Sequence, residues 1–129
     1  MKDRLWSLAD PWLPPIVLMG LIFFLSAQPD LDSGLGVIDL VGRKFVHAGE
    51  YALLCFLWWR ALRTVMQARY APLAALAIAV AYSCTDEFHQ TFVHGRDGSP
   101  RDVLIDAVGS VSVAVWLLRR QGARVGEPG

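Results

Sequence analysis

The sequence is poor in charge and has almost no cysteine. Charged residues occupy 19% of its 129 positions and hydrophobic residues 54%, whereas average soluble domains are roughly 25% charged. The two cysteines, Cys55 and Cys84, lie in apolar runs without CxxC spacing, which excludes a disulfide scaffold and predicts two small buried side chains. Because the formal net charge is zero, the chain lacks the basic excess typical of nucleic-acid binding, and no nucleic-acid partner is expected.

Several signature motifs of enzymes are also missing. There is no HExxH metal motif, no phosphate-binding loop and no nucleophile elbow. We therefore predict neither a bound metal nor a cofactor. One metal site stays open as an alternative, a divalent ion held by His47, Glu50, Glu87 and His89, although Glu87 and His89 diverge on a helix.

Four apolar segments dominate the chain. They cover residues 12–27, 45–62, 71–84 and 103–118, and the mean hydropathy of the whole chain is +0.39. With its flanking residues, each segment reaches about the 17–25 residues that a membrane span needs. The sequence therefore predicts one all-α domain over residues 1–129, an integral membrane bundle of four transmembrane helices.

Small residues recur at intervals of four on two of these segments. Ala71, Ala75 and Ala79 lie on the third segment, and Ser110 and Ala114 lie on the fourth. This spacing puts them on one helix face, where small side chains let helices approach closely in lipid. We expect both stripes to face other helices of the bundle.

Two other interpretations of the apolar segments stay open. The first segment resembles a signal peptide, with Lys2 and Arg4 before an apolar run, but Asp10 and nearby prolines interrupt its front. A soluble four-helix bundle is disfavoured because residues 71–81 and 111–118 lack the polar stripe of an amphipathic helix.

Basic residues are distributed unevenly between the two ends of the predicted helices. Eight lie at the termini or in the connection between the second and third helices: Lys2, Arg4, Arg60, Arg63, Arg69, Arg119, Arg120 and Arg124. Four lie at the other end: Arg43, Lys44, Arg96 and Arg101. Because basic residues favour the cytoplasmic side, we predict a multi-pass protein of the inner (plasma) membrane with both termini cytoplasmic.

Polar residues gather at the outer ends of three predicted helices. The second helix carries Lys44, His47, Glu50 and Tyr51; the third ends in Asp86, Glu87, His89 and Gln90; and the fourth begins near Arg101, Asp102 and Asp106. In a bundle of consecutive hairpins these ends meet, so the sequence predicts an outward-facing acid–base pocket. Ionisable groups inside spans are costly and favour a functional role.

In an enzymatic version of this pocket, Asp86 or Glu87 is the base and His47 its proton partner. Lys44 and Arg96 hold an anionic group. The other candidate ligand-binding residues are Glu50, Tyr51, His89, Gln90, Arg101, Asp102 and Asp106. Membrane lipid is an expected partner, and the ligand is an amphiphilic or lipid-linked envelope component. Neither the oligomeric state nor catalytic turnover follows from these residues.

Structural roles offer a second explanation of the same residues. Lys44 and Arg96 would neutralise Asp86 and Glu87 in a non-catalytic ion-pair lock. Asp102 also fits helix capping, because Ser99 and Pro100 precede it as N-cap and first helical residue. A small transporter is a third alternative, disfavoured because four short helices leave little room.

The combined pattern resembles the VanZ-like family, small polytopic bacterial membrane proteins whose namesake is linked to teicoplanin resistance. Three groups of residues carry the resemblance: SxQP at Ser26, Gln28 and Pro29; KxxHxxEY at Lys44, His47, Glu50 and Tyr51; and DExHQxF…R…D at Asp86, Glu87, His89, Gln90, Phe92, Arg96 and Asp102, with Gly109 after them. The resemblance implies a four-helix membrane protein of the cell envelope. It supplies no established reaction.

Two positions depart from the family pattern. Asp106 stands where the family usually has asparagine, and Val113 stands where a second glycine is common. The first departure adds a carboxylate to the predicted site, and the second bears on helix packing.

Overall fold

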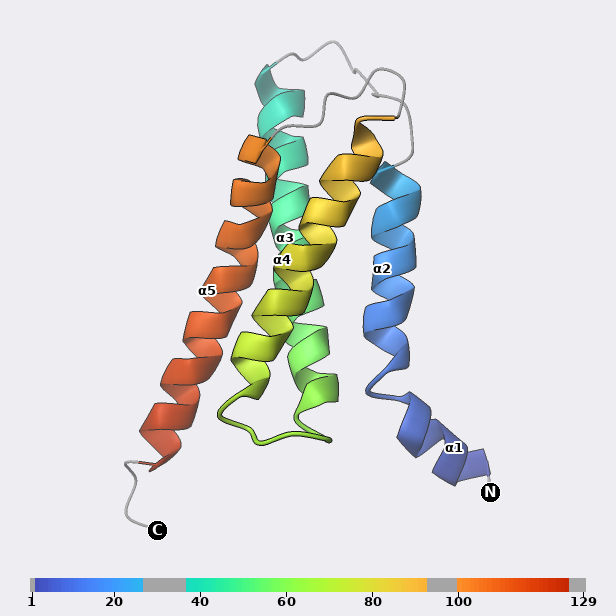
Figure 1. Cartoon of the computed structure of the whole chain (residues 1–129), viewed down its shortest axis with the longest axis vertical. Helices are drawn as coiled ribbons and strands as arrows, with labels where there is room; N and C mark the ends of the chain where they lie inside the picture. Colours follow the sequence, from blue (N-terminus) through green and yellow to red (C-terminus); the bar gives the residue numbers. More distant parts are fainter. Residues whose placement is uncertain (1, 27–36, 93–99, 126–129) are drawn as a thin grey trace.

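The computed structural model describes residues 2–26, 37–92 and 100–125, which form a helical bundle (Figure 1). Five helices make up this part of the chain: α1 (Lys2–Ala9), α2 (Leu13–Ser26), α3 (Val37–Leu62), α4 (Ala71–Gln90) and α5 (Pro100–Val125). No strand occurs in these ranges. The all-α prediction is confirmed.

Prolines mark the beginnings of three helices. Pro14 and Pro15 lie in the first turn of α2, Pro72 is the second residue of α4, and Pro100 opens α5. A proline is tolerated there because the first amides of a helix have no intrahelical acceptor. The predicted start of the last helix at Pro100 is confirmed, whereas Ser99 lies outside the described residues.

Three of the helices are longer than their apolar segments. α3 begins eight residues before Phe45, α4 continues six residues beyond Cys84, and α5 extends to Val125. α1 was not among the predicted segments. Hydrophobicity marks only the apolar part of a helix, and charged residues such as Lys and Glu are themselves good helix formers.

α3, α4 and α5 pack against one another, and α2 packs against α3 and α4. α2 and α4 end where α3 and α5 begin, at the top of Figure 1, which we call the upper end. At the lower end lie the connection between α3 and α4, and α1, which turns away from the bundle. The predicted site residues of α4 and α5 therefore lie in the upper parts of these helices, whereas Glu50 and Tyr51 lie near the middle of α3.

A stripe of small residues along α4 forms the lower core. Ala71, Ala75 and Ala79 are fully buried, and the last two pack with Cys55 and Ala114. The predicted stripes are thus confirmed, with Ser110 also buried on α5. The prediction for Cys84 is wrong, because its side chain is exposed.

α3 and α5 approach closely at Gly109. A Cβ atom added to this glycine would lie 2.2 Å from the carbonyl oxygen of Ala48 on α3. Only a residue without a side chain permits this contact between the two backbones. Gly109 therefore sets the distance between α3 and α5 just below the upper end.

No single helix in the described ranges has both the length and the apolar character of a membrane span. One bent pair does so by length and composition, α1 together with Leu13–Leu25 of α2, at an angle of 55°. The predicted count of four spans thus stays a prediction.

Candidate functional site

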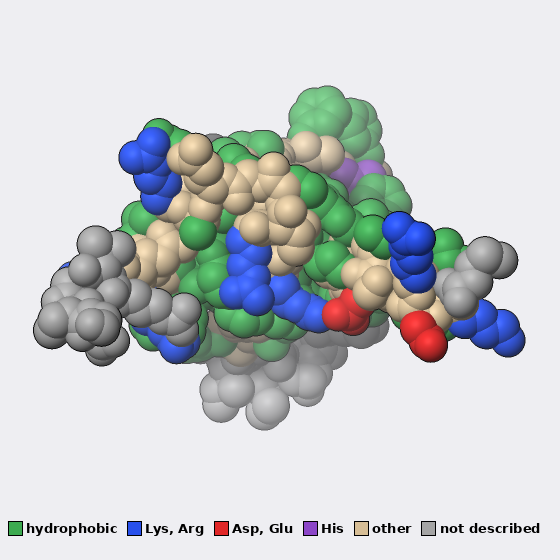
Figure 2. All heavy atoms as spheres, turned by 90° about the horizontal axis from the view of Figure 1, so that it is seen from below, with side chains coloured by type: hydrophobic (Ala, Val, Ile, Leu, Met, Phe, Trp, Pro, Cys, Tyr) green, Lys and Arg blue, Asp and Glu red, His purple; other side chains and the backbone are tan. Residues whose placement is uncertain are grey.

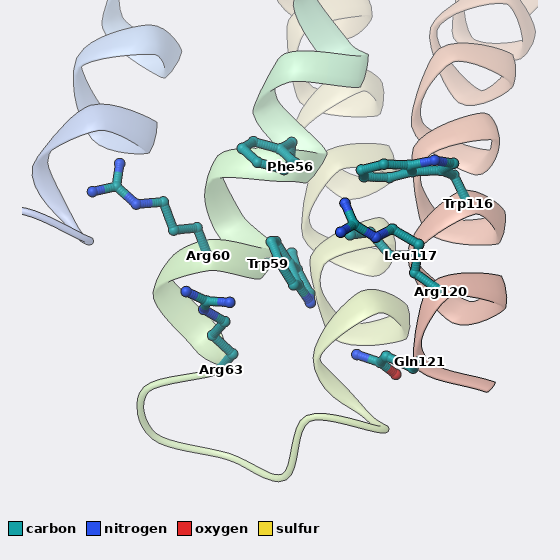
Figure 3. A pocket seen from close by; sticks show the side chains of 8 residues that line it. All are labelled: Phe56, Trp59, Arg60, Arg63, Trp116, Leu117, Arg120 and Gln121. Carbon is teal, nitrogen blue, oxygen red and sulfur yellow. The ribbon is translucent and has the colours of Figure 1, made fainter. Parts of the chain in front are cut away.

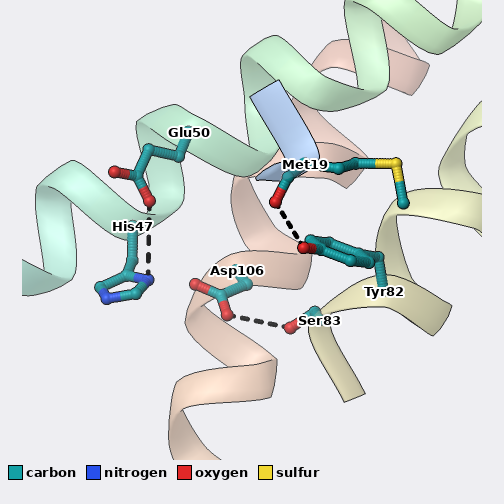
Figure 4. A network of polar contacts seen from close by, with 6 residues as sticks. All are labelled: Met19, His47, Glu50, Tyr82, Ser83 and Asp106. Atoms are coloured by element: carbon teal, nitrogen blue, oxygen red, sulfur yellow. Dashed lines mark hydrogen bonds and ion pairs between the residues drawn. The ribbon is translucent and has the colours of Figure 1, made fainter. Parts of the chain in front are cut away.

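The polar cluster at the upper end begins on α3. His47 and Glu50 are one turn apart, and His47 Nδ1 lies 3.8 Å from Glu50 Oε2 (Figure 4). Both side chains are partly exposed, whereas Tyr51, the next residue, is completely buried. α3 thus contributes an accessible acid–base pair and a buried phenol.

Asp86 on α4 interacts with groups on two helices of the cluster. Its carboxylate interacts electrostatically with Glu50 and Tyr51 of α3 and with Tyr82 on its own helix. Only 3% of Asp86 is exposed. Among the described residues its Oδ1 atom finds no hydrogen-bond donor, and the hydroxyl of Tyr51 is likewise without a partner. The Tyr51 hydroxyl is near enough to Asp86 for a weak hydrogen-bonding interaction, but its geometry falls short of a full hydrogen bond.

α5 enters the cluster through Asp106 and Ser110, both buried. The hydroxyl of Ser83 on α4 donates a hydrogen bond of 2.9 Å to Asp106 Oδ2 (Figure 4). Ser110 donates to the backbone carbonyl of Tyr51 at 3.2 Å. Asp106 also interacts electrostatically with Tyr51, so it belongs to the same cluster as Asp86.

α2 closes the cluster on the remaining side. The hydroxyl of Tyr82 donates to the carbonyl oxygen of Met19 at 2.5 Å (Figure 4). The ring of His89 stacks on Phe23 with centroids 4.3 Å apart. Nδ1 of His89 is buried and has no hydrogen-bond partner in the described part of the chain.

The alternative ion-pair lock would join Lys44 or Arg96 to Asp86 or Glu87. Within residues 37–92 and 100–125, neither Lys44 nor Asp86 takes part in an ion pair. Lys44 therefore does not neutralise Asp86 in the described part of the chain, and the lock as a whole stays a prediction. Arg96, the other predicted cation, lies outside the described residues.

The structure also places four further predicted site residues on α4 and α5. Gln90 is buried on the same face of α4 as Asp86, and Glu87 is half-buried beside it. Arg101 and Asp102 lie in the first turn of α5, and their side chains are not among those the structure describes.

Tyr82 and Ser83 were not predicted as site residues. They precede Asp86 by four and three residues, so a helix puts all three on neighbouring faces. Ser83, Asp86 and Gln90 in fact continue the buried stripe begun by Ala71, Ala75 and Ala79. The spacing of buried residues therefore contained the signal, but hydroxyl groups inside an apolar run do not by themselves indicate a site.

The cluster combines carboxylates, an imidazole and hydroxyls, which can donate, accept and exchange protons. The alternative metal set is not brought together, because His47 pairs with Glu50 while His89 stacks on Phe23. No group of three or more potential metal ligands converges in the described ranges.

Fold and site together define the class of this protein: a helical bundle with a cluster of carboxylate and hydroxyl groups toward one end. The VanZ/LLP1 family model matches residues 12–120, which include nearly all of α2–α5 and the whole cluster. The chain belongs to the VanZ/LLP1 family, and the resemblance in its motifs is confirmed. No curated protein and no solved structure matches the chain.

Proposed function

We propose that this VanZ/LLP1 protein is a multi-pass protein of the plasma (inner) membrane, with four spans and both termini in the cytoplasm. Its upper end faces outward. There the acid–base cluster binds a cell-envelope component or an amphiphilic glycopeptide antibiotic, and its carboxylates and His47 exchange protons with that ligand.

The outer surface of the bundle supports the membrane location. Large apolar side chains are exposed on every helix of the bundle, for example Phe24 on α2, Phe45 on α3, Leu73 on α4 and Val108 on α5. Soluble monomers rarely expose contiguous apolar surface on this scale. Asp86 and Asp106 lower the average hydropathy of their helices but point inward, so the surface is more apolar than the helix average.

The orientation can be tested with reporter fusions. Fusions at Gly126 and between Arg63 and Arg69 are expected to report the cytoplasm, and fusions at Asp97 the exterior, because basic residues predominate at the lower end. Alkaline phosphatase and green fluorescent protein at each position measure this directly. An active phosphatase at Gly126, or a mature chain that begins near Gln28, would contradict the proposal.

The unsatisfied polar atoms around Asp86 are the observation that carries the functional proposal. Buried polar groups are normally hydrogen-bonded, because an unpaired one costs about 1–3 kcal/mol. Asp86 Oδ1, the Tyr51 hydroxyl and His89 Nδ1 are all buried without partners among the described residues. An acceptor, a hydroxyl and an imidazole nitrogen at one end of the bundle suit a polar ligand that both donates and accepts hydrogen bonds.

Asp86→Asn tests the proposal, because it keeps the size of the side chain and removes its charge and its basicity. The protein and its variant are expressed in a teicoplanin-susceptible bacterial host, and the inhibitory concentration of teicoplanin is measured. We expect the wild type to raise it about fourfold or more, and Asp86→Asn to return it to the vector value at equal amounts of membrane protein, since one general acid–base group contributes about 100-fold or more to a rate.

Thr85→Ala is the matched control. Thr85 is exposed, precedes Asp86 on α4 and bonds only to Ala81 of its own helix. It should behave as the wild type does. A wild-type protein without effect on susceptibility, or an Asp86→Asn variant with full effect, would refute the proposed function.

A further inference from the structure

A second candidate site lies at the lower end, away from the acid–base cluster. A pocket of about 350 Å³ opens between α3 and α5 (Figure 3). It is lined by aromatic, basic and other side chains of these two helices and of the residue after α3: Phe56, Trp59, Arg60, Arg63, Trp116, Leu117, Arg120 and Gln121. Figure 2 views this end, where Lys and Arg side chains stand out against hydrophobic surface.

Two of the three arginines are positioned by tryptophan rings. The guanidinium carbon of Arg63 lies 4.8 Å from the ring centroid of Trp59, and that of Arg120 lies 4.9 Å from the ring of Trp116. Stacking leaves the edges of a guanidinium group available, and these edges bind phosphate in a bidentate manner. The pocket therefore presents two oriented anion-binding groups.

Within the described part of the chain, no carboxylate neutralises these two arginines. No carboxylate lines the pocket. Asp10 pairs with Arg60 at 2.6 Å, but neither Arg63 nor Arg120 takes part in an ion pair with any residue the structure describes. The pocket thus has a net positive charge and suits an anion.

An apolar groove of about 430 Å³ adjoins this pocket, and Trp116 lines both. Its other lining residues are mostly small and carry no charge: Phe45, Ala48, Gly49, Ala52, Gly109, Ser112 and Val113. The groove follows α3 from Phe45 to Ala52, about 10 Å at 1.5 Å per residue. Its floor is the close contact between Gly109 and Ala48.

We propose that the pocket and the groove together bind one anionic phospholipid. The phosphate is held by Arg63 and Arg120, and one acyl chain lies along the groove between α3 and α5. A soluble phosphate would occupy only the pocket. An amphiphile with a negatively charged head group would occupy both, with its phosphate in the pocket and its acyl chain in the groove. The inference rests on the membrane location proposed above but not on the acid–base role of the upper cluster.

The test compares two lipids with the same acyl chains. The full chain is purified in dodecyl maltoside, and dioleoyl phosphatidylglycerol or dioleoyl phosphatidylcholine is added while bound lipid is measured by native mass spectrometry. We expect the anionic lipid to bind about tenfold more tightly or better, and R63Q/R120Q to abolish this preference, because charge-assisted contacts to phosphate are lost. R119Q, which removes one positive charge beside the pocket, should retain it.

The groove is tested separately. Gly49→Leu places a large side chain in it and should weaken binding of both lipids by about tenfold. Gly42→Leu on the same helix is the control, because Gly42 is also surrounded by open space but does not line the groove. Circular dichroism verifies that each variant keeps its helices.

Three results would overturn the inference. They are equal binding of the two lipids, loss of preference in R119Q as in the double variant, and complete displacement of the anionic lipid by millimolar glycerol 3-phosphate, which would indicate a site for a soluble phosphate. None of them bears on Asp86→Asn and teicoplanin, so the two proposals fail independently.

Discussion

Replacing Gly109 with alanine is expected to destabilise the bundle more than the same replacement at any other glycine that the structure describes. The new Cβ would lie 2.2 Å from the carbonyl oxygen and 2.9 Å from the carbonyl carbon of Ala48. Atoms cannot remain at these separations, and the obstacle is backbone that no side-chain rotation can remove. α3 and α5 must therefore move apart along their contact.

The cost of this movement should be large relative to total stability. Overpacking a well-packed core costs about 1–3 kcal/mol and occasionally more, and a backbone obstacle puts Gly109→Ala at the upper end of that range. Unfolding in mixed detergent micelles, followed by circular dichroism against the fraction of dodecyl sulfate, measures the loss of free energy of unfolding.

Gly49→Ala on the facing helix α3 is expected to have the opposite effect on stability. A Cβ at Gly49 meets nothing within 4 Å, and replacing glycine by alanine inside a helix gains up to about 1 kcal/mol. The two substitutions should thus shift the transition in opposite directions. If Gly109→Ala unfolds at the same dodecyl sulfate fraction as the wild type, the close contact of α3 and α5 is not the native arrangement.

Replacing His47 with glutamine is expected to abolish the teicoplanin phenotype without loss of folded protein. Glutamine keeps hydrogen-bonding capacity but cannot carry a proton as charge. His47 is partly exposed and lies 3.8 Å from Glu50, so no core packing depends on it. Membrane immunoblots measure the amount of protein, and the inhibitory concentration of teicoplanin measures function.

Under the proposed function, Glu50 is expected to pass a proton between His47 and Asp86. It lies 3.8 Å from His47 and interacts electrostatically with Asp86. Glu50→Gln should consequently reproduce the effect of His47→Gln, and the double variant should be no worse than either single one, because residues that act as a unit are not additive. If the His47→Gln variant keeps the teicoplanin phenotype, hydrogen bonding without proton transfer is sufficient at this position.

Periodic features of the sequence predicted the structure well. The four-residue spacing of Ala71, Ala75 and Ala79 identified the buried face of α4, and the prolines identified the first turns of α2 and α5. Both features act within one helix, where geometry is fixed by 3.6 residues per turn. The helical class and the family followed from the same local patterns.

Features that depend on contacts between helices were predicted poorly. The sequence offered Lys44 or Arg96 as partners of Asp86 or Glu87, whereas the described groups that interact with Asp86 are Glu50, Tyr51 and Tyr82. Opposite charges attract in any arrangement, so charge alone does not select a pair. Which groups meet depends on helix rotation, and that is set by packing contacts such as Gly109 against Ala48.

The small-residue core below the polar cluster limits how material can move through this protein. Ala75 and Ala79 of α4 meet Cys55 and Ala114 with almost no exposed surface, so the three central helices are in direct contact beneath Asp86. In the described part of the chain this core leaves no open passage between α3, α4 and α5 from the cluster to the lower end. Net movement of a molecule across the bundle would require these three helices to separate along this contact.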